Sequence, residues 1–268
     1  MTDQDYRVGV AARLLAIFTG LVLIVPTLVV IPLSFTDRMS FKFPPAGWSI
    51  KFYRNLLIGD EWRGPLISSV QLALVVMVIS VVIGLLASVG ITRGKLKIAN
   101  ALNIGFLAPM IVPSIVFAIA IYFALLKLHL FGTFAGFVIA HTVIAIPFPI
   151  VTITAGLRGL DTDLERAAAT QGANRLTAFT HVTLPLLVPS VLAGAAFAFI
   201  TSFDEIVVSL FIQSTQFRTL PVKMFTSVST ESDPTIAAAA SVVIVISTSL
   251  LVGAQMLTKV LARRRNGA

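Results

Sequence analysis

Residues 164–185 read LERAAATQGANRLTAFTHVTLP, a polar stretch between two long apolar runs. The alanines at 167–169 and Leu176 favour helix, whereas Gly172 permits a turn or a close contact in the middle. Pro185 lies just inside the next apolar run, where a proline in the first helical turn is tolerated. The stretch therefore predicts a short helix, a bend, and a second short helix that leads into a membrane span.

The composition of the 268-residue chain is typical of a polytopic membrane protein. Hydrophobic residues make up 57% of it, the mean hydropathy is +0.95, and only 12% of residues are charged, about half the usual share. The net charge is +8, but the Lys and Arg residues cluster at the ends of apolar runs, which disfavours nucleic acid as a partner. The absence of cysteine excludes disulfides, thiol catalysis and cysteine-based metal sites.

Six apolar runs each approach or exceed the roughly 20 residues needed to cross the hydrocarbon core. They predict an all-α fold, a single membrane domain over residues 1–268 with six transmembrane helices. The expected spans are 13–35, 65–91, 101–126, 133–157, 184–212 and 235–257. Several contain prolines, which membrane helices tolerate when neighbours satisfy the freed carbonyls. The first run lacks a small-residue cleavage site and is expected to remain as an anchor.

Six spans place both termini on one side of the membrane, and the positive-inside rule selects the side. With the N-terminus in the cytoplasm, inside segments hold the larger share of the Lys and Arg residues. The clearest clusters are Arg93–Lys97 and Arg263–Arg265. This orientation places the polar segment 158–183 in the cytoplasm.

The spacing within that segment resembles the cytoplasmic loop of permease subunits of binding-protein-dependent ABC importers. The family pattern is Glu-Ala-Ala, three residues, Gly, nine residues, an aliphatic residue, one residue, and Leu-Pro. The matching positions here hold Ala167, Ala168, Gly172, Val182, Leu184 and Pro185. Arg166 occupies the position of the family's glutamate, and Glu165 precedes it. The resemblance covers most of the chain, including six spans and the loop between spans four and five.

This resemblance implies the type I ABC importer permease architecture in a bacterial inner membrane. Residues 158–183 would form a coupling helix on a separate ATPase, and ATP binding there would switch the spans between inward and outward openings. The chain lacks a GxxxxGK[ST] phosphate-binding loop, so we expect that it is not an enzyme and binds no cofactor itself. ATP and Mg would bind to the partner ATPase. The implied partners are an ATPase dimer, a second related permease, an external solute-binding protein and membrane lipid.

Asp204 and Glu205 are adjacent carboxylates within the fifth predicted span. An aspartate at the centre of a membrane helix costs about 2.5–3.5 kcal/mol on insertion scales. Helical neighbours point about 100° apart, so at most one of the two faces a central pathway. One interpretation is a site for a cationic solute. The alternatives are a structural pair with a partner's Arg or Lys, or a cap on the external mouth.

Two further stretches resemble the spermidine/putrescine branch of these permeases: SFDEIVVSLF at 202–211 and AHTVIAIPFPI at 140–150. A diamine or triamine needs carboxylates and aromatic faces, and cation–π contact would help. The candidate pathway residues are Asp204, Glu205, Ser202, Phe203, Ser114 and Tyr122. Ser114 follows Pro113, where that branch often carries an acidic residue. An opine, an amino-acid-like compound or another small polar solute therefore stays an alternative.

Two other classes of function remain alternatives to the importer. An ion-coupled secondary transporter would use Asp204 and Glu205 as a proton or sodium site, but it would not account for the spacing of the cytoplasmic loop. An intramembrane enzyme would need a nucleophile and a base within the spans, and the sequence offers no such pair. His141 is expected to be a hydrogen-bonded packing residue, and the three scattered histidines predict no metal site.

Overall fold

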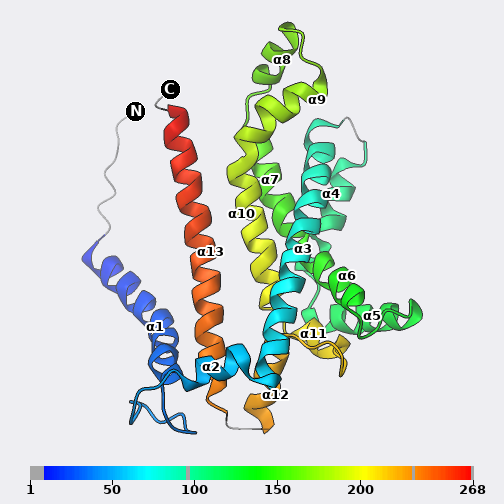
Figure 1. The fold of residues 1–268 in the computed structure, drawn as a ribbon. Coiled ribbons are helices and arrows are strands. Elements are labelled where there is room, and N and C mark those ends of the chain that lie inside the picture. The colour runs from blue at the N-terminus through cyan, green and yellow to red at the C-terminus, as the bar shows by residue number, and fades with distance from the viewer. Residues whose placement is uncertain (1–8, 95–96, 231–232, 267–268) are drawn as a thin grey trace.

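The computed structural model describes residues 9–94, 97–230 and 233–266, and their regular secondary structure is helical (Figure 1). The long helices are α1 (Val10–Ser34), α3 (Asp60–Arg93), α10 (Leu184–Phe203) and α13 (Thr235–Asn266). Among the described residues, four helices are long and apolar enough to cross a membrane, or up to six if each of two bent pairs counts as one span. The predicted all-α membrane fold is confirmed.

The third predicted span, 101–126, is not one continuous helix. It consists of α4 (Ala99–Leu107), the short 3-10 helix η1 (Ala108–Met110) and α5 (Ser114–Lys127), and the two parts meet at 102°. Pro109 and Pro113 lie at the break. Proline lacks an amide hydrogen and disfavours helical geometry in the preceding residue, so two prolines in one short stretch end the helix.

The fourth predicted span is a milder case of the same effect. It is divided into α6 (Phe134–Ala145) and α7 (Pro147–Arg158), which are bent by 41°. Pro147 is the first residue of α7, a position where its missing amide hydrogen costs little. The chain therefore bends at the proline and continues.

The fifth predicted span, 184–212, ends early. Helix α10 stops at Phe203, and α11 (Val207–Ile212) begins after a three-residue break. The sequence predicts Asp204 and Glu205 inside a continuous helix. That prediction is wrong, because both residues lie at this break. Glu205 stabilises the start of α11, because its carboxylate accepts a hydrogen bond from the free amide of Val208.

Two short helices lie outside the six predicted spans. Helix α2 (Lys51–Ile58) buries Phe52 and Leu56, which are one helical turn apart on the same face. Helix α12 (Leu220–Thr230) buries Leu220 and Val222. Both lie at one end of the molecule, whereas α8 (Asp163–Thr170), α9 (Arg175–Ala178) and the C-terminal end of α13 lie at the other (Figure 1).

The centre of the structure is the contact of α7 with α3 and α10. A Cβ atom at Gly84 of α3 would lie 2.6 Å from Cβ of Pro149. A Cβ atom at Gly194 of α10 would lie 2.8 Å from Cα of the same proline. Small residues at these two positions allow both helices to approach α7 closely, as is common in membrane helix packing.

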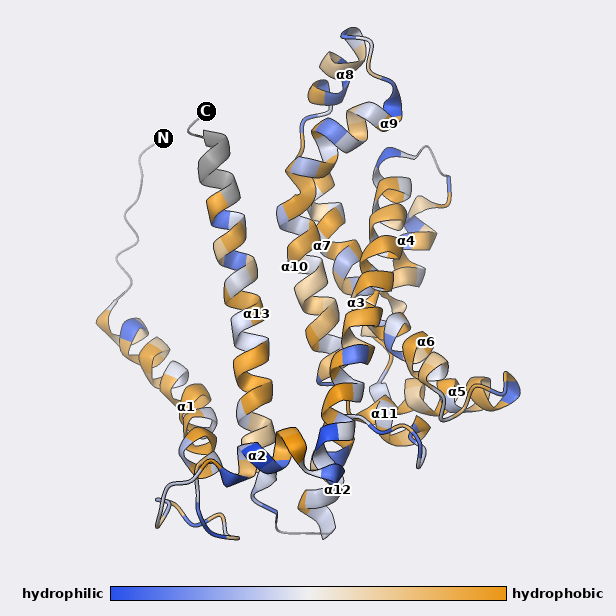
Figure 2. Cartoon of the chain, viewed as in Figure 1, coloured by the Kyte–Doolittle hydropathy of each residue, from blue (hydrophilic) through white to orange (hydrophobic). Residues whose placement is uncertain are grey.

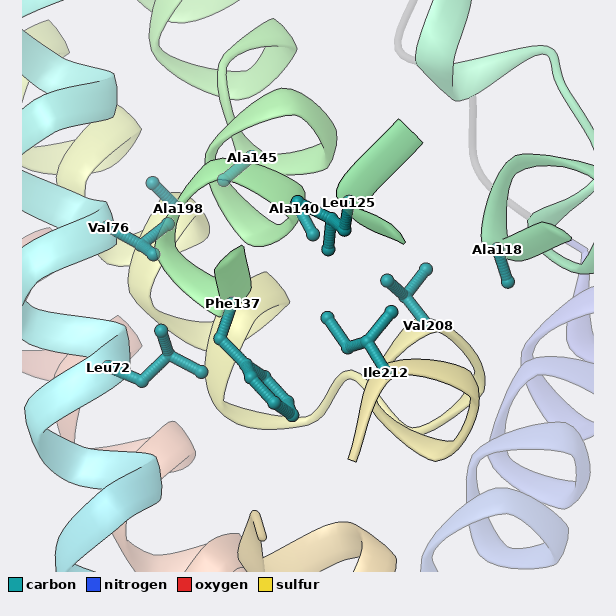
Figure 3. Close-up of a cluster of buried hydrophobic side chains, with 10 residues drawn as sticks. All are labelled: Leu72, Val76, Ala118, Leu125, Phe137, Ala140, Ala145, Ala198, Val208 and Ile212. Carbon is teal, nitrogen blue, oxygen red and sulfur yellow. The ribbon is translucent and has the colours of Figure 1, made fainter. Parts of the chain in front are cut away.

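A second packing region joins α3, α5, α6 and α11. Figure 3 shows the ring of Phe137 between Leu72 of α3 and Ile212 of α11, and all three are fully buried. Apolar residues dominate the long helices, and polar residues collect toward their ends (Figure 2). The apolar surface of α1 is largely exposed and packs only partly, on α13.

Candidate functional site

Residues 158–183, named the coupling segment after the role that the resemblance implies, have the helix–bend–helix form that the sequence predicts. Helix α8 ends in a Schellman turn, in which Ala173 N donates to Ala168 O at 3.1 Å and Gly172 N donates to Ala169 O at 3.0 Å. Gly172 has φ +88°, a conformation that favours glycine. The Asn174 side chain then caps α9 by accepting from Thr177 N at 2.8 Å.

Helix α9 runs into α10 through the π-helical turn η2 (Phe179–Thr183). A π turn holds one more residue than an α turn and is common at functional sites. Leu184 and Pro185, the last two residues of the family pattern, form the start of α10 directly after it. The segment is therefore continuous with α10, which ends at Phe203, next to Asp204.

Glu165 and Arg166 lie side by side in α8 but face different surroundings. Glu165 Oε1 accepts from Thr183 Oγ1 at 2.7 Å and lies 3.5 Å from Nη2 of Arg93. It thus joins α8 to the π turn and to the last residue of α3. Arg166 has an exposed side chain and pairs only with the nearby Asp163, at 2.7 Å, among the contacts of the described residues.

The outer surface of this segment is accessible. Gly172 is exposed, and a Cβ atom added there would meet nothing within 4 Å. Leu176 is 72% exposed although it is large and apolar. Ala167 is exposed and Ala168 is half-buried. A pocket of about 1030 Å³ lies between this segment and the end of α3, and Arg93, Glu165, Arg166, Arg175 and Phe179 are among its lining residues.

The two adjacent carboxylates at the α10–α11 break also differ. Glu205 is half-buried, and its Oε1 accepts from Val208 N at 2.8 Å, which caps α11. Asp204 is exposed and lines a pocket of about 630 Å³ between α1, α10, α12 and α13. Among the described residues that line this pocket, Asp204 is the one charged side chain.

Asp204 also occupies a helix end that favours cations. It is the C-cap residue of α10, and its amide donates to Ile200 O at 3.0 Å. The free carbonyls at a helix C-terminus carry partial negative charge, equivalent to about half an elementary charge. A carboxylate added there raises the local negative potential, so the site can attract a positively charged group.

The other predicted pathway residues are not gathered around Asp204. Ser202 is 3% exposed, and Phe203 is 1% exposed and stacks on Phe199 with ring centroids 5.4 Å apart. Tyr122 lies on α5, edge-on to Phe123 and Phe131. Ser114 is exposed at the start of α5. Neither Ser114 nor Tyr122 lines the Asp204 pocket.

Sequence reasoning missed several residues at these two sites. Phe225 is the aromatic residue of the Asp204 pocket and is 49% exposed. It lies on α12, outside the predicted spans. Arg93 and Thr183 also contact Glu165. Arg93 is far from Glu165 in sequence, and Thr183 is at a position that the family pattern leaves unspecified. His141, which was expected to be a hydrogen-bonded packing residue, is fully buried and bonded to Ser202 and Ser209.

Comparison with known proteins identifies the family of this chain. Residues 80–266 match the family described as "Binding-protein-dependent transport system inner membrane component". The chain is 28% identical over 238 residues to the spermidine/putrescine transport system permease protein PotC of Haemophilus influenzae, covering 88% of this chain and 92% of that protein. It is 29% identical over 207 residues to the trehalose transport system permease protein SugB of Mycobacterium tuberculosis, covering 76% of each chain.

A solved structure shares the fold. It is the crystal structure of a bacterial ABC transporter involved in the import of the acidic polysaccharide alginate, with a TM-score of 0.65, 13% identity, and coverage of 97% of this chain and 98% of that chain. The family match covers well over half of the sequence and includes the coupling segment and the α10–α11 break. The chain belongs to the inner-membrane permease components of binding-protein-dependent ABC importers.

Proposed function

We propose that this permease moves a small cationic solute of the polyamine class, such as putrescine or spermidine. The observation that carries the proposal is the position of Asp204, the one charged side chain among the described residues of an otherwise uncharged pocket. An alkylamine combines a charged end with an apolar chain. The Asp204 carboxylate can pair with the charged end, while Phe225, Ile236 and Val243 offer apolar surface to the chain.

Similarity to PotC supports this assignment because it extends over nearly all of both chains. Overall identity does not decide the solute, since identity to the trehalose permease is about as high. Trehalose carries no charge, so a pocket for it gains nothing from charge complementarity with a carboxylate. The charge at Asp204 is therefore a better guide to the solute than the percentage identity.

We further propose that the coupling segment docks on a separate ATPase, which binds ATP and Mg and supplies the energy. Leu176 and Gly172 would form the contact surface, because Leu176 is apolar and exposed and the glycine permits close approach. Glu165 would hold the segment onto its own chain through Arg93 and Thr183. The remaining coupling residues, in the proposed surface or beneath it, are Arg166, Ala167, Ala168, Leu184 and Pro185.

The proposed assembly contains two ATPase chains, this permease with a second related permease, and an external solute-binding protein. The apolar and largely exposed side chains of α1 support a partner or lipid around that helix. The coupling segment and the C-terminal end of α13 lie at the same end of the molecule (Figure 1). Both would face the cytoplasm, together with the N-terminus, and residues 1–8 of that terminus lie outside the described residues.

The test is uptake by the reconstituted importer. The chain is expressed with its native neighbours, purified in mild detergent, placed in liposomes, and assayed for ATP-dependent uptake of labelled putrescine, spermidine, trehalose and an amino acid. The polyamines are expected to be taken up, and Asp204→Asn is expected to raise their apparent KM about tenfold, the scale of one lost charge-assisted contact. Asp60→Asn, an exposed acid on α3, is the control for net charge.

Three outcomes would contradict parts of the proposal. Uptake of only an uncharged or zwitterionic compound would assign another small polar solute. Normal polyamine kinetics in Asp204→Asn would make that carboxylate structural. Uptake by the chain alone, without an ATPase, would indicate an ion-coupled transporter.

A further inference from the structure

The break between α10 and α11 leaves backbone groups without helical partners. In a continuing helix, the Ser202 carbonyl would accept from the amide of Ile206, but α10 ends at Phe203. Such terminal groups need side chains, water or ligands to satisfy them. Glu205 satisfies one amide at the start of α11. The free end of α10 requires a donor from elsewhere in the fold.

His141 of α6 supplies that donor. Its Nδ1 lies 3.2 Å from the Ser202 carbonyl oxygen and 3.0 Å from Ser202 Oγ, while its Nε2 lies 3.0 Å from Ser209 Oγ. A carbonyl oxygen can only accept, so Nδ1 carries the hydrogen, and Nε2 of the neutral ring accepts from the Ser209 hydroxyl. One buried imidazole therefore closes the end of α10 and also holds the first turn of α11.

The surroundings of His141 connect this contact to the coupling segment. His141 lies on α6, α6 continues into α7, and α7 ends at Arg158, where the coupling segment begins. The coupling segment in turn leads through η2 into α10. The two chain segments that flank the coupling segment thus meet again at His141 and Ser202. The coupling segment is therefore connected to the break along both routes.

We propose that His141 is a positioning residue that fixes the direction of α11 relative to α10 and so holds Asp204 toward its pocket. The part concerning solute rests on the proposed function. The part concerning geometry does not, because it follows from three contacts of a fully buried ring. Neither serine side chain alone can replace the ring, since Ser202 and Ser209 lie on separate helices.

The geometric part can be measured directly because the chain contains no cysteine. Spin labels are attached at Leu192→Cys on α10 and Gln213→Cys at the end of α11, in the assembled importer with cysteine-free partner chains. Double electron–electron resonance, a pulsed electron paramagnetic resonance method, then gives the distribution of distances between the two labels. His141→Phe keeps a ring but loses all three polar contacts. It is expected to broaden this distribution about twofold or to shift its maximum, because a buried cap is lost.

Three further variants make the measurement specific. His141→Asn keeps a donor for the Ser202 carbonyl and is expected to restore most of the parent distribution. Ser209→Ala removes the contact between His141 Nε2 and Ser209 Oγ and is expected to broaden the distribution. This variant tests the positioning role of His141 if His141→Phe fails to assemble. Thr142→Val is the matched control, because Thr142 is the next residue, is buried, and has a hydroxyl without a hydrogen-bond partner among the described residues.

The same variants are tested for uptake of labelled putrescine. His141→Phe is expected to raise the apparent KM about fivefold while the maximal rate changes less, since Asp204 is displaced from the pocket but the energy source is intact. Distance distributions that coincide for the parent, His141→Phe and Ser209→Ala would overturn the proposal. An altered distribution with an unchanged KM would overturn the role toward solute. Failure of the parent to transport any polyamine would contradict the proposed function, and the distance measurement, which needs no solute, would still decide this inference.

Discussion

Adjacent acidic and basic residues in this chain perform different tasks. Glu165 points into the protein and Arg166 points out, while Glu205 caps a helix and Asp204 faces a pocket. Glu165 and Arg166 differ because neighbours on a helix point in different directions, whereas Asp204 and Glu205 differ because one ends α10 and the other precedes α11. Each residue in such a pair can therefore be tested against its neighbour.

Glu165 is expected to hold the coupling segment in place. Glu165→Ala removes the bond from Thr183 and the pairing with Arg93, so amides of α8 should exchange hydrogen about fivefold faster, the scale of one net hydrogen bond. Arg166→Ala should leave exchange in α8 nearly unchanged, because its pair with Asp163 is exposed. Hydrogen exchange with mass spectrometry checks both, and equal protection in Glu165→Ala and the parent would remove this role.

Glu205 is expected to act through its capping oxygen and not through its charge. Glu205→Gln retains an acceptor for Val208 N and should transport like the parent. Glu205→Leu should destabilise the protein by about 1 kcal/mol, the usual cost of a lost cap. Thermal unfolding in detergent measures the stability. If Glu205→Gln impaired polyamine uptake as strongly as Asp204→Asn, the charge of Glu205 would have to be assigned to the solute.

Gly172 tests the proposed docking surface. Its φ of +88° is unfavourable for most residues but accessible to Asn and Asp. Gly172→Asp is expected to insert and to fold, because a Cβ atom there meets nothing within the chain, although the left-handed backbone adds about 1–2 kcal/mol of local strain for any side chain. ATP-driven uptake should nevertheless fall about tenfold, the effect of about 1.4 kcal/mol at an interface, while ATP hydrolysis continues. Gly172→Ala is the smaller control, and normal uptake in Gly172→Asp would argue against docking at this turn.

At the scale of elements, close helix packing around α7 is expected to contribute to stability. Gly84→Ala would place a Cβ atom 2.6 Å from Cβ of Pro149, so α3 must move and the protein should lose about 1–3 kcal/mol. Gly90→Ala lies in the same helix and meets nothing within 4 Å. It should be neutral or slightly stabilising, because alanine favours helix. Thermal unfolding of the two variants compares them, and equal midpoints would contradict the packing argument.

The elements that the sequence predicted well are those governed by local chemistry. Long apolar runs gave the spans, and Gly172 with its neighbours gave the turn in the coupling segment. The bend at Pro109 and Pro113 was underestimated, because a proline in a span can be absorbed or can end the helix according to its neighbours. Helix α12 was missed because its apolar face is short and its partners, such as Ser69 and Glu61, lie far away in sequence.

The candidate site was predicted only in part for the same reason. The sequence identified Asp204 and Glu205, but it placed them inside a helix and could not tell which of the two was a cap. Phe203 was expected to offer an aromatic face, yet its ring belongs to the core. The aromatic residue that lies near Asp204 is Phe225, from a helix that only the tertiary structure reveals.

At the scale of the whole molecule, the two proposed sites lie at different levels along the helices. The coupling segment projects from one end, together with the C-terminal end of α13, whereas α2 and α12 form the other end (Figure 1). Helix α10 joins the coupling segment to the Asp204 break over 20 residues, about 30 Å at 1.5 Å per residue. A rigid helix of this length can convert a push at one end into a displacement at the other.

This polarity predicts which partner each end contacts. A photoreactive amino acid at Leu176, which is 72% exposed on the coupling segment, is expected to cross-link to the ATPase in the assembled importer. The same amino acid at Val228, which is 68% exposed on α12, should capture no ATPase because it lies at the opposite end. Mass spectrometry of the cross-linked bands identifies the partners. Both side chains are large, apolar and similarly exposed, so a difference in cross-linking between them must come from their position. Capture of the ATPase at Val228 but not at Leu176 would reverse the proposed orientation of the chain.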